Sequence, residues 1–148
     1  MRVLVDTHAL LWAISGDRRL SKRAHSVLAS FANEVFVSAA SAWEITTKHR
    51  LGKLPSAEGL VADFGRIIEQ LGFHALPISI EHAQRAGSLP GDHRDPFDRM
   101  LVAQAQSENL PLVSNERIFD FYGIKRIWQA GGRYRRPSTS LRATLGKC

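Results

Sequence analysis

Short apolar runs that alternate with longer helical patterns are the feature that most constrains how this chain can fold. Five runs have the character of β-strands: residues 2–6, 34–38, 74–79, 111–114 and 124–128. The segments between them carry apolar residues at helical spacing. Strands that alternate with helices through short connections are typical of a parallel sheet covered by helices. We therefore predict an α/β protein with three layers, α/β/α, and a central parallel sheet of about five strands.

Local signals place some of these elements more closely. The third run contains Pro77, which cannot donate a ladder hydrogen bond, so this strand is predicted to lie at an edge of the sheet. Residues 57–71 have one apolar face and are predicted to form a single helix that ends at Gly72. The pair Asp95-Pro96 is typical of a helix start, and the helix is predicted to run to about residue 109.

Length and charge indicate one domain with a basic extension. A chain of 148 residues is long enough for one domain with a proper hydrophobic core. Residues 129–148 hold five of the 20 basic residues and no acidic residue, so 15 basic and 14 acidic residues remain in residues 1–128. The net charge of +6 is therefore largely a property of residues 129–148. We predict that this segment is a flexible tail, which either touches RNA electrostatically or is a dispensable extension.

Cysteine usage and hydropathy bear on the cellular compartment. The single cysteine is Cys148, so a disulfide within the chain is impossible. No apolar stretch approaches the roughly 20 residues that span a bilayer, and the start M-R-V-L-V-D is a strand pattern rather than a signal peptide. We expect a cytoplasmic protein with no membrane partner.

Acidic residues follow several of the predicted strands, at the start of the helices that come next. The candidate site residues are Asp6, Glu44, Asp95, Asp98 and Glu116. In an open parallel sheet, ligands bind outside the carboxyl ends of the strands, so these carboxylates are predicted to converge on one rim. Such a cluster repels itself unless a cation neutralises it, which points to a divalent metal.

Two of these acids have structural alternatives in the first half of the chain. Asp6 is equally suited to cap the helix that follows it. Glu44 lies in S-A-W-E, which matches the capping box that begins with Ser41. The helix is predicted to begin nearer Ser38, which would place Glu44 one to two turns in and free to project toward the rim.

The remaining acids also have structural alternatives. Asp95 precedes a proline at the first helical position, so capping is its expected structural role. Asp98 near the third position and Glu116 at the start of a short helix both favour the helix dipole. No single acid therefore indicates a site, and the prediction rests on the occurrence of all of them at the same edge of the sheet.

Other functional motifs are missing from the sequence. No histidine pair has the H-x-x-x-H spacing of a zinc site, and His8 and His93 read as exposed residues with a possible supporting role beside the acids. No glycine-rich phosphate loop or G-x-S-x-G elbow occurs. The tryptophans, among them Trp43, are predicted to lie in the core.

Four segments together resemble the PIN-domain family, and more narrowly the VapC-type toxins of bacterial toxin–antitoxin pairs. They are V-L-V-D-T-H, S-A-A-S-A-W-E-I, H-R-D-P-F-D-R-M-L-V-A-Q-A and L-P-L-V-S-N-E. The resemblance covers about residues 1–128 and implies a PIN-like nuclease domain there. It also implies a Mg²⁺- or Mn²⁺-dependent endoribonuclease that a cognate VapB-like antitoxin holds inactive and that is often a homodimer.

The resemblance also assigns the acids. It places the family's first aspartate at Asp6, the glutamate at Glu44 and the third acid at Asp98, with Asp95 as an additional acid of the subgroup. The fourth position is usually an aspartate, and here it is Glu116, which leaves open whether this residue binds metal directly or through water. Thr7 and Ser114 match small hydroxyl positions that support the site.

The predicted chemistry is hydrolysis of an RNA phosphodiester, with Asp6 and Asp98 as the metal ligands. Two rival functions stay open. One is a metal-dependent DNA nuclease or phosphatase, although a D-x-D phosphatase would need an acid where His8 stands. The other is a non-catalytic PIN-like module that binds RNA or protein.

Overall fold

A parallel five-stranded sheet forms the centre of the molecule. The computed structural model describes residues 1–128, so the predicted basic tail at 129–148 lies outside the described residues. The strands are β1 (Arg2–Val5), β2 (Glu34–Ser38), β3 (His74–Leu76), β4 (Leu112–Val113) and β5 (Arg126–Ile127). They lie in the order β3-β2-β1-β4-β5, and each neighbouring pair is parallel. The predicted sheet is thereby confirmed, including the edge position of the strand that precedes Pro77.

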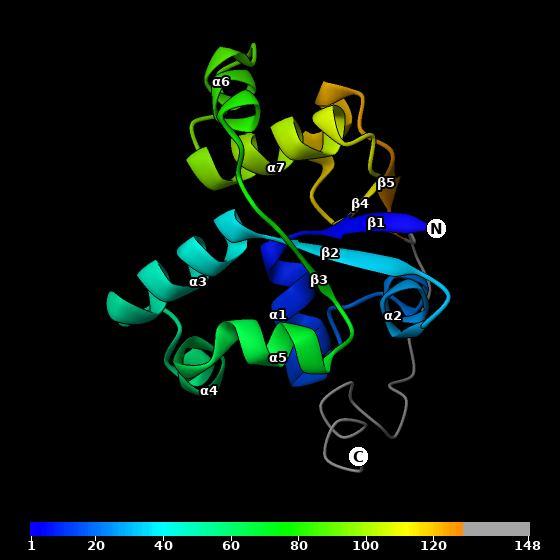
Figure 1. The fold of residues 1–148 in the computed structure, drawn as a ribbon, viewed down its shortest axis with the longest axis vertical. Helices are drawn as coiled ribbons and strands as arrows, with labels where there is room; N and C mark the ends of the chain where they lie inside the picture. The colour runs from blue at the N-terminus through cyan, green and yellow to red at the C-terminus, as the bar shows by residue number, and fades with distance from the viewer. Residues whose placement is uncertain (129–148) are drawn as a thin grey trace.

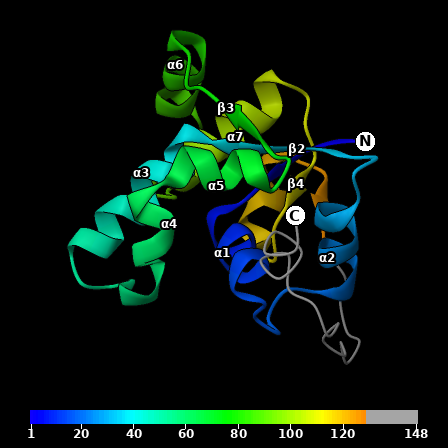
Figure 2. The same ribbon diagram turned by 60° about the horizontal axis from the view of Figure 1, so that its bottom comes forward.

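Helices cover both faces of this sheet (Figures 1 and 2). The α-helices are α1 (Thr7–Ser15), α2 (Lys22–Ala29), α3 (Ala39–Arg50), α4 (Glu58–Ala62), α5 (Phe64–Gln70), α6 (Ile80–Ser88) and α7 (Pro96–Ser107). Two 3-10 helices complete the described chain, η1 (Pro55–Ala57) and η2 (Arg117–Tyr122). The three-layer prediction is confirmed.

The alternation of side chains along the strands creates two separate cores. In β1, Val3 and Val5 point into a core that is shared with α1, α2 and α5, whereas Leu4 points into a core that is shared with α7 and η2. Successive residues of a strand face opposite sides of a sheet, so a run of apolar residues can serve both layers. This explains why the central strands read as continuous apolar runs.

The predicted helix over residues 57–71 was wrong as a single element. Asp63 has φ −151° and ψ 53°, which lies outside the helical region and separates α4 from α5. Its carbonyl accepts from the amide of Ile67, so a new helical turn starts at the break. Leu60 on α4 and Ile68 on α5 are both buried in the same core. The apolar spacing detected this packing face but not the bend within it.

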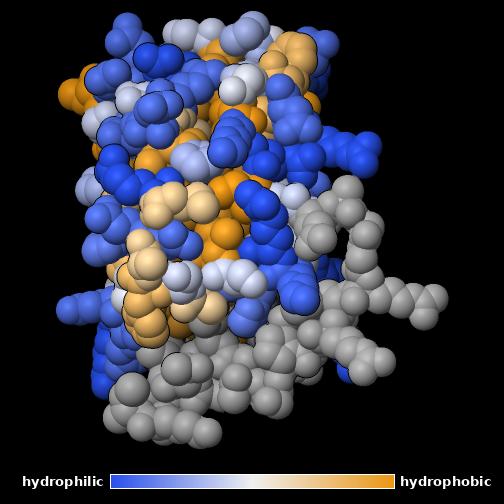
Figure 3. All heavy atoms as spheres, turned by 90° about the vertical axis from the view of Figure 1, so that its right-hand side faces the viewer, coloured by the Kyte–Doolittle hydropathy of each residue, from blue (hydrophilic) through white to orange (hydrophobic). Residues whose placement is uncertain are grey.

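The surface mixes hydrophilic and apolar residues. On the face drawn in Figure 3, hydrophilic residues surround a central band of apolar ones. Large exposed apolar side chains of the molecule include Phe31, Trp43 and Ile80, so the predicted core position of Trp43 was wrong. Within residues 1–128, no helix has the length and apolar character needed to cross a membrane.

Candidate functional site

The site lies at the topological switch point of the sheet, where the order of the strands reverses. From β1 the chain builds outward through β2 to β3, and it then returns to add β4 on the other side of β1. The amide of Asp6 donates to the carbonyl of Val113 at 3.0 Å, which joins the ends of β1 and β4. A crevice at the carboxyl ends of strands is expected at such a switch point. Asp6 therefore stands at its centre.

Asp6 combines a capping role with an unfavourable environment for its charge. Its Oδ1 accepts from the amide of Ala9 at 2.7 Å, so the predicted capping role is confirmed. The residue is only 3% exposed. Burial raises the pKa of the Asp6 carboxyl to about 6, the charge of Glu116 adds to this effect, and hydrogen bonds with Ser114 and Ala9 oppose it.

Glu44 projects from the second turn of α3 rather than capping the helix. Ser38 is the N-cap and accepts from the amide of Ala40 at 3.0 Å, so the predicted helix start is confirmed. Glu44 is 3% exposed, and its Oε2 accepts from Nζ of Lys48 at 2.5 Å. The capping-box alternative is therefore excluded. Ser41 lies one turn before Glu44 on α3. Its hydroxyl accepts from the hydroxyl of Thr7 at 2.9 Å, and this bond joins α1 to α3.

The two aspartates of α7 have different roles. Asp95 caps the helix, since its Oδ1 accepts from the amides of Phe97 and Asp98. Asp98 accepts from Nε2 of His93 at 3.0 Å, and its side chain is 17% exposed. Burial raises the pKa of the Asp98 carboxyl to about 6, the hydrogen bond from His93 opposes this, and the charges of Asp95, Glu116 and Glu44 add to it.

Glu116 lies beyond β4 and is held from both ends. Its amide donates to the hydroxyl of Ser114 at 3.0 Å, and its Oε1 lies 3.2 Å from Nδ1 of His8. The hydrogen bond with His8 lowers the pKa of the Glu116 carboxyl and raises that of the His8 imidazole. Glu116 makes no side-chain capping bond to η2, so its carboxylate is directed to the site rather than to that helix.

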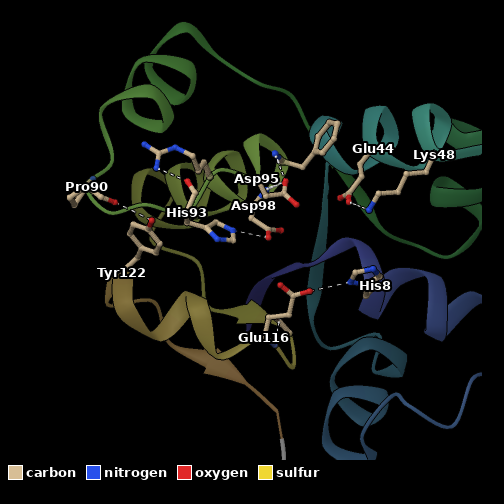
Figure 4. Close-up of polar contacts among 12 residues, drawn as sticks. His8, Glu44, Lys48, Pro90, His93, Asp95, Asp98, Glu116 and Tyr122 are labelled. Atoms are coloured by element: carbon tan, nitrogen blue, oxygen red, sulfur yellow. Dashed lines mark hydrogen bonds and ion pairs between the residues drawn. The ribbon is translucent and has the colours of Figure 1, made fainter. Parts of the chain in front are cut away.

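These side chains come together from separate parts of the chain. Figure 4 shows Glu44, Asp95, Asp98 and Glu116 directed toward a common space, with Lys48, His8 and His93 at its margin. Of the predicted site residues, these four therefore lie together, and the charge of Glu116 links them to Asp6, whose pKa it raises. Glu44, Asp98 and Glu116 are each paired with a lysine or an imidazole, whereas Asp95 accepts from backbone amides. Within residues 1–128, no group of three His, Cys, Asp or Glu side chains is arranged to hold a metal ion.

The sequence underestimated two histidines. His8 and His93 each bond a site carboxylate, whereas an exposed position with no fixed partner was the preferred interpretation of both. The sequence carries no specific signal for either contact. His8 follows Asp6 by two residues, on the first turn of α1, and His93 precedes Asp98 by five on the connecting loop. Neither spacing belongs to a motif, so only the folded backbone reveals the contact.

Trp43 and Phe97 form an apolar margin next to the acids. The two rings meet edge to face, with centroids 5.0 Å apart, and Trp43 is 62% exposed. Both line an apolar pocket of about 200 Å³ between α3 and the α6–α7 region, together with Ile78 and Met100. Each ring directly precedes a site acid in sequence, namely Glu44 or Asp98.

Arg99 holds the loop that presents His93. Its guanidinium donates to three backbone carbonyls, those of Ala86 at 3.1 Å, Leu89 at 2.6 Å and His93 at 3.1 Å. Five N–H groups in a rigid fork suit this task. The side chain is therefore committed to the protein's own backbone rather than to a substrate.

Replacing Arg99 by methionine should lower the free energy of unfolding by about 2 kcal/mol, because three carbonyls lose a charged donor. Urea denaturation at pH 7 measures this change. The matched control is Arg94→Met on the same loop, where the side chain is exposed, and a change within about 0.5 kcal/mol is expected there. Equal losses in the two variants would contradict the role of Arg99.

Comparisons with known proteins agree with this fold. Ribonuclease VapC16 of Mycobacterium tuberculosis is 36% identical over 61 residues, which span 41% of this chain and 42% of that protein. The chain thus covers less than half the length of this relative. VapBC2 from Rickettsia felis, solved bound to a DNA fragment from their promoter, gives a TM-score of 0.60 at 17% identity, covering 86% of this chain and 98% of the other.

A second solved structure, FitAB bound to the IR36 DNA fragment, also gives a TM-score of 0.60. It is 16% identical, and the alignment covers 90% of this chain and 100% of that one. At such identities the two structures show only that the fold is similar. The sequence itself matches the PIN domain over residues 3–125. The parallel sheet, the acids at its carboxyl edge and this match together show that the chain belongs to the PIN domain family.

Proposed function

We propose that this protein is a Mg²⁺-dependent endoribonuclease of the VapC type, which hydrolyses RNA phosphodiester bonds and also accepts Mn²⁺. The observation that carries the proposal is the cluster of acids at the carboxyl end of the sheet, in which the buried Asp6 and the half-buried Asp98 have carboxyl pKa values raised to about 6. Carboxylates that are destabilised by burial and by neighbouring acids are favourable ligands for a hard divalent cation. The name of the relative Ribonuclease VapC16 supports the same activity.

The donor set fits a magnesium-like ion. All the acids offer oxygen, and Mg²⁺ keeps several waters while it binds one or two carboxylates. Asp6 and Asp98 would hold the ion, and water molecules would complete its coordination. When bound, the ion would lower the pKa of a water molecule and neutralise charge on the scissile phosphate.

The other acids would act on water and on the geometry of the site. Glu116 has a lowered carboxyl pKa and is fixed by His8, so it stays ionised and can orient the attacking water or accept its proton. Glu44 is buried and bonded to Lys48. It would add a further negative charge to the site. Asp95 fixes the start of α7, and thereby the position of Asp98.

Removal of the metal is the direct test. Cleavage of a single-stranded RNA by the purified protein should fall at least about 1000-fold when EDTA is added, and Mg²⁺ or Mn²⁺ should restore it. Single-stranded DNA of the same sequence serves as the matched substrate and should stay intact. Cleavage that is unaffected by chelation would contradict the proposal.

The same assay distinguishes the rival functions. Equal cleavage of DNA would indicate a metal-dependent DNA nuclease, and release of phosphate from a monoester would indicate a phosphatase. RNA binding without cleavage at any metal concentration would instead support a non-catalytic module that binds RNA or protein.

We also propose a small VapB-like antitoxin as a protein partner and a homodimer as the functional state. Two structural neighbours, VapBC2 and FitAB, were both solved bound to DNA fragments. The exposed ring of Trp43, packed against Phe97, offers apolar surface beside the site. Co-expression with the product of a small adjacent reading frame should yield a complex without RNA cleavage, and light scattering of the isolated protein should give the mass of a dimer.

A further inference from the structure

Lys48 lies one helical turn beyond Glu44, at the margin of the acid cluster. Its Nζ donates to Oε2 of Glu44, whose side chain is only 4% exposed, whereas that of Lys48 is 34% exposed. Within residues 1–128, no other lysine or arginine forms an ion pair with an acid of the site. Figure 4 shows the lysine reaching back along α3 toward the glutamate, on the side that faces the other acids.

The influence of Lys48 extends beyond this pair. Burial opposes its charge, yet the hydrogen bond and charge of Glu44 and the charges of Asp95 and Asp98 together raise its pKa. The positive charge of Lys48 in turn helps to lower the pKa of Glu116. One ammonium group therefore interacts with carboxylates from α3, from α7 and from the turn after β4.

The pair of Lys48 with Glu44 differs from an ordinary ion pair on the surface of a helix. Exposed pairs at this spacing contribute little to stability, and their loss leaves neighbouring groups unaffected. Here the glutamate is buried, so removal of the lysine leaves an uncompensated charge away from water. Asp95 and Asp98 lose the favourable interaction with its positive charge at the same time. If Lys48 only pairs with Glu44, its removal leaves the electrostatic environment of Asp95 and Asp98 unchanged. If it is a shared counter-ion, its removal takes a stabilising positive charge from both carboxylates.

We propose that Lys48 is a positioning residue that serves as the resident counter-ion of the acid cluster and competes with a divalent cation for it. In the metal-free protein the ammonium holds Glu44 in place and offsets the charges of Asp95 and Asp98. A bound divalent cation must then enter against this positive charge. The inference rests on the proposed function, because it concerns the same carboxylates.

Calorimetric titration with Mn²⁺ and thermal unfolding in EDTA test the proposal without any activity measurement. Lys48→Met should bind Mn²⁺ about tenfold more tightly than the wild type, because a positive charge near the ion is gone. Its metal-free melting temperature should fall by about 5 °C. Lys53→Met, an exposed lysine on the loop after α3, is the matched control and should change neither quantity.

A second pair of variants tests the proposal if Lys48→Met alone does not fold. Glu44→Gln removes the buried charge, and Glu44→Gln with Lys48→Met then leaves no unpaired glutamate. The double variant should bind Mn²⁺ about tenfold more tightly than Glu44→Gln alone, because Asp95 and Asp98 still lose the lysine. An effect confined to the Glu44 pair predicts equal affinities in this comparison.

The outcomes separate this inference from the proposed function. If the wild type binds Mn²⁺ and the lysine variants bind it equally or more weakly, the counter-ion role is overturned and the nuclease proposal stands. If neither the wild type nor the variants bind Mn²⁺, both proposals are overturned. Binding that appears only after removal of the lysine supports the competition directly.

Discussion

Asp98→Asn should lower the rate of RNA cleavage by about 1000-fold while it stabilises the metal-free protein at pH 7. The loss of activity follows from removal of a charged metal ligand and corresponds to about 4 kcal/mol of transition-state stabilisation. The gain in stability follows from the raised carboxyl pKa, because a neutral amide does not suffer the burial and repulsion that act on the aspartate. The amide oxygen can still accept from His93.

The gain in stability should be about 3 kcal/mol, since a carboxyl whose pKa is raised to about 6 from 3.8 is destabilised when it is charged. Urea denaturation in EDTA at pH 7 measures this gain, and single-turnover cleavage measures the rate. Asp92→Asn, at an exposed position of the same connecting loop, should leave both within experimental scatter. An Asp98→Asn variant that is inactive but destabilised would mean that the aspartate has a structural role instead.

The stability of the metal-free protein should fall as the pH rises from about 4 to about 6. Asp6 and Asp98 have folded-state carboxyl pKa values near 6, above the ordinary value of 3.8. Between these values the folded state binds protons that the unfolded state has released, so the folded state loses its advantage as the pH rises. Glu116 acts in the opposite direction, because its lowered pKa contributes stability that is lost as the pH falls.

The double variant Asp6→Asn with Asp98→Asn isolates this effect from the other acids. Its stability relative to the wild type should be nearly unchanged near pH 3.5 and should rise by about 3 kcal/mol per site by pH 7. Urea denaturation in EDTA across this range gives the difference curve. A flat curve would mean that the two carboxyls titrate normally. Metal affinity should also weaken below pH 6, because protons then compete for the same ligands.

The fold was largely predictable because its signals are local. Apolar runs of strand length, the proline beyond β3 and the cap at Asp95 each report on a few neighbouring residues. The break at Asp63 was not predictable in this way, because it changes the backbone direction without changing the apolar spacing. Trp43 was misplaced for a related reason. Its apolar ring reads as core, and only the tertiary arrangement leaves it exposed beside Phe97.

The site was predictable in its acids and not in its bases. Asp6 follows a strand, and Glu44 and Asp98 lie in the first two turns of their helices, so the rule for carboxyl ends of parallel strands predicts that they lie near one another. The partners Lys48, His8 and His93 depend on side-chain reach and on loop geometry. Glu44 and Lys48 do have the spacing of neighbours on one helix face. That spacing is common on solvated helices, so it does not distinguish a residue of a site from an ordinary surface pair.

The pairing of β1 with β4 joins segments that are far apart in the sequence and therefore affects how the newly made chain folds. β1 is synthesised first, yet one of its neighbours is β4, and His8 meets Glu116 at a separation of 108 residues. Contacts of such long sequence separation form slowly, because a large loop must close. A ribosome must therefore release nearly the whole domain before Asp6 and Glu116 can face one another. The growing polypeptide carries an incomplete centre until its last strands emerge, which separates the synthesis of this protein from the onset of any chemistry.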